Sequence, residues 1–133
     1  MIFKKRRYPL PRFPHNVARE FKLYCEVLPD ERVLEFIPEV SEVVAHFHEL
    51  SEQHPLLDIE RVDEIGRMCT ELLQTYPNCK PAHKRMIVGA VRYFASTDDP
   101  MSETSFASGL DDDVRVLNHV AEELGRDDLY LEE

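Results

Sequence analysis

Two clusters of aspartates stand in the C-terminal third of the chain, and carboxylates grouped in this way are able to bind metal ions. Asp98 and Asp99 precede a short segment of small and polar residues, and Asp111, Asp112 and Asp113 follow it. Carboxylate oxygens are the ligands that Mg²⁺ and Ca²⁺ prefer in proteins. If the fold brings the clusters together, Asp98, Asp99, Asp111 and Asp112 would hold a divalent cation, in a metal-dependent enzyme or a metal-binding protein.

A structural role explains the same clusters without a cation. Counting from Asp98 or Asp99, neither the central glycine nor the closing glutamate of an EF-hand loop falls in register. Residues 111–113 stand where a helix is expected to begin, and Asp99-Pro100 is typical of an N-cap followed by the first helical residue. Carboxylates there accept hydrogen bonds from free backbone N–H groups, each worth ~0.3–1 kcal/mol. We favour this interpretation.

Histidines and glutamates in the segment AHFHELSEQH are a second candidate for metal chemistry. A carboxylate-bridged di-iron bundle uses Glu-x-x-His pairs on two helices. The chain has only the reversed order, at His46-x-x-Glu49 and His119-x-x-Glu122, so we interpret the histidines as part of a solvated helix face. A P-loop, a Gly-x-Ser-x-Gly elbow and an HExxH motif are also missing. No sequence motif therefore points to an enzyme.

Apolar residues recur at steps of three and four almost throughout the chain, which is typical of helices with one buried face. Pro38 interrupts the longest run, so we expect a short helix and then a long one. Asp30 and Asp58 are placed to cap helices, and Gly125 stands where a helix C-terminus favours positive φ. We predict an all-α, single-domain bundle of five to six helices, with apolar runs at 17–28, 33–50, 59–76, 81–94 and 114–124.

The net charge of −10 is distributed unevenly along the chain. The basic residues of segment 1–14, which contains no acid, are Lys4, Lys5, Arg6, Arg7 and Arg12. Residues 98–133 are strongly acidic, and such a surface repels phosphates and excludes general binding of nucleic acid. The basic arm would be solvated, dock on the acidic region of its own or a neighbouring copy, or contact an anionic membrane as a peripheral protein.

The cysteines and the hydropathy favour a cytoplasmic protein. Cys25, Cys69 and Cys79 are odd in number and form no CxxC pair, which favours buried free thiols over a disulfide framework or a structural zinc site. No apolar run approaches the ~20 residues that cross a bilayer. Prolines occupy the place where the apolar core of a signal peptide would lie.

Residues 81–124 resemble the YkvA-like family, a small bacterial helical domain of unknown function. The matching elements are Tyr93-Phe94 at a helix end, the turn Asp98-Asp99-Pro100, and Gly109-Leu110-Asp111-Asp112 opening the next helix. The resemblance implies a corner between two helices with facing acids, which Arg92 or Arg115 would neutralise. Family members usually carry an apolar IPD…IP stretch between the acidic elements, where this chain has the polar MSETSFASG. This departure argues against the membrane association that some members suggest.

From these patterns we predict a non-enzymatic interaction module, bound to a protein partner or to another copy of itself. The expected organisation is a basic arm at 1–14, a helical domain at 15–126 and an acidic tail at 127–133. The recognition surface would be the 95–112 turn and the acidic C-terminal region. The expected interaction residues are Lys4, Lys5, Arg6, Arg7 and Asp113. No cofactor is expected, apart from the divalent cation of the metal hypothesis.

Overall fold

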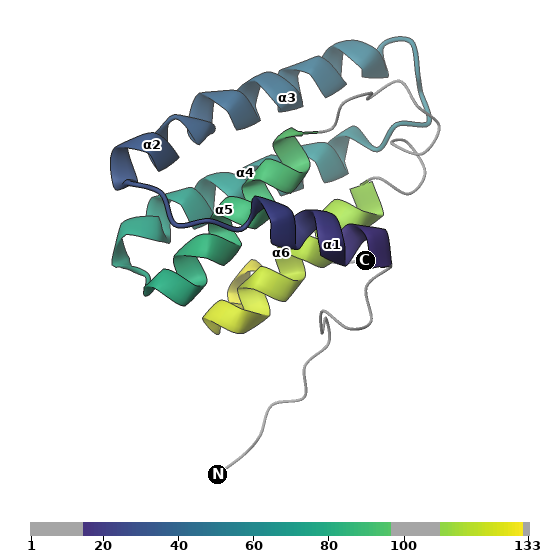
Figure 1. The fold of residues 1–133 in the computed structure, drawn as a ribbon. Coiled ribbons are helices and arrows are strands. Elements are labelled where there is room, and N and C mark those ends of the chain that lie inside the picture. The colour runs from purple at the N-terminus through teal and green to yellow at the C-terminus, as the bar shows by residue number, and fades with distance from the viewer. Residues whose placement is uncertain (1–14, 97–109, 132–133) are drawn as a thin grey trace.

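The periodic apolar residues form helices throughout the described part of the chain, which comprises residues 15–96 and 110–131 of a computed structural model (Figure 1). The helices are α1 (His15–Tyr24), α2 (Asp30–Leu34), α3 (Phe36–Ser51), α4 (Ile59–Thr75), α5 (Pro81–Ala95) and α6 (Leu110–Leu124). Two short 3₁₀ helices, η2 (Tyr76–Asn78) and η4 (Asp127–Leu129), follow α4 and α6. The described residues contain no strand, and the predicted all-α bundle is confirmed.

The helix boundaries follow the local sequence with one exception. Pro38 lies in the first turn of α3, where its missing N–H breaks no helical hydrogen bond, and the short α2 precedes it as predicted. The Asp58 side chain caps α4, and Gly125 ends α6 with a φ of +72°. The prediction that Asp30 is an N-cap was wrong. The extended ψ of Pro29, 146°, already separates the chain from the helix, so Pro29 is the N-cap and Asp30 the first helical residue.

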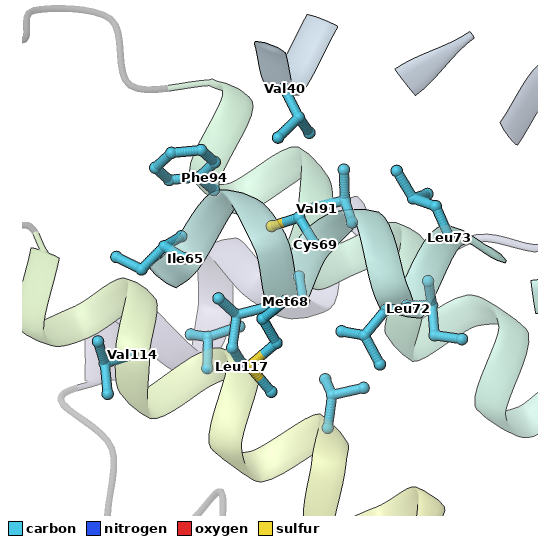
Figure 2. Packing of buried hydrophobic residues seen from close by; sticks show 14 of the residues in the cluster. Val40, Ile65, Met68, Cys69, Leu72, Leu73, Val91, Phe94, Val114 and Leu117 are labelled. Atoms are coloured by element: carbon cyan, nitrogen blue, oxygen red, sulfur yellow. The ribbon is translucent and has the colours of Figure 1, made fainter. Parts of the chain in front are cut away.

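Helix α4 lies at the centre of the bundle and packs against α3, α5 and α6. Its residues Ile65, Cys69 and Leu72 recur at steps of four and three and are fully buried. Figure 2 shows them among apolar side chains that include Phe94 of α5 and Leu117 of α6. Full burial of such a side chain stabilises the fold by ~1.5–3 kcal/mol. This shared core fixes the positions of the surface helices.

The segment between α1 and α2 is held by a buried tyrosine of η2. The Tyr76 hydroxyl donates to the Leu28 carbonyl oxygen at 2.6 Å and accepts from the Leu28 N–H at 2.9 Å. Both polar groups of Leu28 are thereby satisfied where no helix continues. The contact joins residues 48 positions apart in the chain.

Residues 127–131, which we expected in an acidic tail, pack against α6. The buried Asn118 side chain donates from Nδ2 to the Leu131 carbonyl oxygen at 3.0 Å and accepts from the Leu131 N–H at 2.9 Å. An asparagine amide carries both the donor and the acceptor that this pairing requires. Leu131 itself is 9% exposed. The folded domain therefore extends at least to Leu131.

Candidate functional site

The three aspartates at the start of α6 lie in different environments. Asp111 is exposed, Asp112 is half-buried, and Asp113 is buried with 5% of its surface exposed. Asp113 stands three residues after Leu110 and four before Leu117, so the helical repeat places all three on the buried face. Asp113, which we expected on the interaction surface, therefore does not present its carboxylate to a partner.

The surroundings of Asp113 disfavour its ionised form. Burial is the largest cause of a pKa well above the ordinary value, and the negative charges of Asp112 and of Glu20 on α1 act in the same direction. The pKa of Tyr93 on α5 is also raised, first by its burial and then by Asp112 and Asp113. Among the described residues, no ion pair joins Asp113 to a basic side chain.

The two arginines expected beside these acids have different neighbours. The charge of Arg115 lowers the pKa of Asp112, but burial of that carboxyl is the larger effect and raises the pKa overall. Arg92 instead forms an ion pair with Glu26 at 2.8 Å and donates to the Tyr24 carbonyl oxygen at 3.3 Å. Arg92 thus fastens the end of α1 to α5.

The proposed metal site combines Asp98 and Asp99 with Asp111 and Asp112, and the structure describes only the second pair. Asp98 and Asp99 lie outside the described residues, as do Lys4, Lys5, Arg6 and Arg7 of the basic arm. Within residues 15–96 and 110–131, no group of three or more His, Cys, Asp and Glu side chains is arranged to hold a metal ion. The metal hypothesis therefore stays a prediction.

The two thiols with shifted pKa values are poor nucleophiles. Burial raises the pKa of Cys69, which lies in the core, and burial raises that of Cys25 to about 11. A nucleophilic cysteine needs a lowered pKa, because the thiolate is the reactive form. Neither thiol is prepared for covalent catalysis.

The histidine-rich end of α3 is exposed and makes one polar contact with α4. His48 Nε2 lies 2.6 Å from Asp63 Oδ1, so this pair joins the two helices near the turn between them. His46 and Glu49 are exposed, as the interpretation of a solvated helix face expects.

A groove of about 550 Å³ lies between α3 and α4, which form the antiparallel hairpin at the top of Figure 1. Its apolar lining residues are Val40, Val44, Ala45 and Gly66. Gly66 allows the two helices to approach closely, because a Cβ at this position would lie 2.8 Å from a methyl group of Val44. No pattern in the sequence indicates this groove.

Glutamates lie on the exposed side of α3, and two of them neighbour the groove. Glu39, Glu42 and Glu49 are spaced so that they share a helix face with His46, and all four are exposed. Within the described part of the chain these three glutamates form no ion pair. Glu42 and Glu49, three residues before and four residues after the lining residue Ala45, give the α3 edge of the groove a negative charge without an ion-pair partner in the described residues.

A second groove, of about 300 Å³, separates α4 from the C-terminal segment. Arg67 and Glu71 line both grooves, so α4 forms the ridge between them. Arg126 joins α4 to the C-terminal segment, because its Nη2 lies 3.7 Å from a carboxylate oxygen of Glu71 and 3.0 Å from one of Asp128. We call the whole surface the acidic face. Its carboxylates are Asp63, Glu64, Glu71 and Asp128, which line the two grooves, and Glu42 and Glu49, which neighbour the lining residue Ala45.

Comparisons with protein-family models, with curated proteins and with solved structures found no match for this chain. The resemblance of residues 81–124 to the YkvA-like family therefore stays a prediction. In the two described ranges, no helix is both long enough and apolar enough to span a membrane.

Proposed function

We propose that the protein is a non-enzymatic interaction module that binds a basic segment of a partner protein. The observation that carries this proposal is the acidic face, where exposed glutamates stand beside an apolar groove. Surfaces of one charge attract partners of the opposite charge and reject partners of the same charge. The acid-rich C-terminal region, which we expect to recognise a partner, lines the second groove of this face through residues 128–131.

The balance of charges supports a basic partner. Arg126 partly neutralises the α4 side, and Arg61 does so at 3.4 Å from Glu64. The glutamates of α3 have no such compensation in the described residues, and the whole chain carries a net charge of −10. The chain's own residues 1–14 are basic and free of acids, so a neighbouring copy is among the partners that this face would accept.

Two synthetic helical peptides of opposite charge test the proposal. One consists of leucine and lysine, the other of leucine and glutamate, each with one apolar face. We expect the full chain to bind the lysine peptide, and to lose about tenfold in affinity (~1.4 kcal/mol) when salt screens the charges. Fluorescence anisotropy at low and high ionic strength measures both. Equal binding of the two peptides, or binding of neither, would reject the proposed function.

A further inference from the structure

We propose that the α3–α4 groove seats one amphipathic helix of a partner protein, with apolar side chains on the groove floor and lysines or arginines against the α3 glutamates. This inference rests on the proposed function, and it names the class of partner and the place of binding. The partner is defined by chemistry: a helix with one apolar face and basic residues beside it.

The shape and lining of the groove fit a helix. The groove has a volume of about 550 Å³, and Val40, Val44, Ala45 and Gly66 form its apolar floor. It runs between two packed helices whose side chains form inclined rows, and the ridges of a third helix fit such rows. The 16 residues of α3 extend for about 24 Å. A partner helix of about four turns matches that length.

The carboxylates beside the groove favour a partner helix with positive charge. Glu42 and Glu49 stand three residues before and four residues after the lining residue Ala45, at the α3 edge of the groove, and Asp63 and Glu71 line it from α4. On the α4 side Asp63 lies beside His48 and Glu71 beside Arg126. Basic residues on the α3 edge of a bound helix would therefore meet the carboxylates that are unpaired in the described residues, while its apolar face covers the floor. This is the helix-in-groove mode of recognition, in which apolar anchors recur at helical spacing.

A basic side chain, Arg67, also lines the groove, and it restricts the charges that the partner helix can carry. Arg67 lines the groove, is exposed, and forms no ion pair within the described residues. An acidic residue among the basic ones, placed toward the middle of the α4 edge, would pair with it. The favoured partner is therefore predominantly basic, with a single acid on the edge that faces α4.

The test compares two substitutions that add the same side chain to exposed helical alanines. Ala45→Arg places a large cation on the groove floor, and Ala82→Arg places it at the start of α5, outside the groove. With the leucine–lysine peptide as probe, we expect Ala45→Arg to weaken binding at least tenfold and Ala82→Arg to change it less than twofold. Circular dichroism and thermal unfolding of both variants check that each remains folded.

A second peptide separates the groove from charge alone. It has the same leucines and lysines in an order that forms no apolar face, and we expect it to bind at least tenfold more weakly. If both peptides bind equally, or if Ala45→Arg binds as the wild type does, the groove proposal is rejected while the proposed function stands. If neither peptide binds, both fail together.

Two other occupants would also overturn the assignment to a partner helix. If sedimentation shows a dimer that Ala45→Arg converts to a monomer, the groove holds a second copy of the chain. If removal of residues 1–14 raises the affinity for the peptide, the groove holds the protein's own basic arm.

Discussion

Asp113→Asn is expected to stabilise the folded protein at neutral pH, by about 1–3 kcal/mol, the usual desolvation penalty of a buried polar group. Asp113 lies on the buried face of α6 with 5% of its surface exposed. The charged groups that raise its pKa, besides its burial, are the carboxylates of Asp112 and Glu20. Placing a carboxylate there costs solvation that no basic side chain of the described residues restores. Asparagine has nearly the same shape and carries no charge.

The pH dependence follows from the direction of the shift. Because burial raises the pKa of Asp113 in the folded state, the folded chain holds this proton more tightly than the unfolded chain. The stability from this group is complete below the unfolded pKa, ~4, and is lost as the pH rises toward the folded pKa. Asp112, whose pKa is also raised, acts in the same direction. We expect the wild type to lose stability as the pH rises above the unfolded pKa, ~4, and Asp113→Asn to lose less.

Urea unfolding at several pH values measures the effect. Asp111→Asn is the matched control, because Asp111 is exposed on the same turn, and its replacement should only lower the free energy of unfolding, by the ~0.3–1 kcal/mol of a carboxylate at a helix N-terminus. If Asp113→Asn is less stable than the wild type at every pH, the carboxylate has a stabilising partner, and this account of its environment is wrong.

Gly89→Ala is expected to destabilise the protein by about 1–3 kcal/mol, the usual cost of overpacking a tight contact. Helix propensity alone predicts the opposite sign, because alanine is favoured over glycine by ~1 kcal/mol inside a helix. At Gly89 a Cβ would lie 2.5 Å from the Cys25 Sγ, 3.0 Å from a ring carbon of Phe21 and 3.2 Å from the Phe21 carbonyl oxygen. The first atom can rotate away, but the last belongs to the backbone of α1. Helix α1 must therefore shift.

Gly66→Ala provides a graded comparison for this prediction. Its Cβ would meet only the side chain of Val44, so a smaller loss is expected than at Gly89. Cys25→Ala in the background of Gly89→Ala should restore part of the stability, since it removes the closest atom. Thermal and urea unfolding of the three variants measure the order. A Gly89→Ala variant more stable than the wild type would show that α1 and α5 are not in such close contact.

Much of the fold could be predicted because it depends on residues close in the sequence. The apolar period gave the helices, and Pro38 and Asp58 gave two of their boundaries correctly. Asp30 was misplaced by one residue because Pro29 already supplies the extended conformation that precedes a helix. The docking of residues 127–131 was missed because it depends on a polar residue, Asn118, inside an otherwise apolar helix face.

The candidate site was harder to predict because it depends on how helices pair. The acidic run of α6 indicated a surface, yet the positions of Leu110 and Leu117 already place Asp113 on the buried face. The groove exists only where α3 lies against α4, and Ala45 and Gly66 become its floor through that pairing. The exposed glutamates of α3 were visible in the sequence, but nothing local distinguishes a binding face from a solvated one.

The most direct test of the central claim, that the acidic face receives a basic amphipathic helix, is a nuclear magnetic resonance titration of the isotope-labelled full chain. With the leucine–lysine peptide, we expect the largest shifts in the amides of the groove residues of α3 and α4, and small shifts in α1 and α5. Perturbations centred on the start of α6, or spread evenly over the exposed acids of the chain, would contradict the claim.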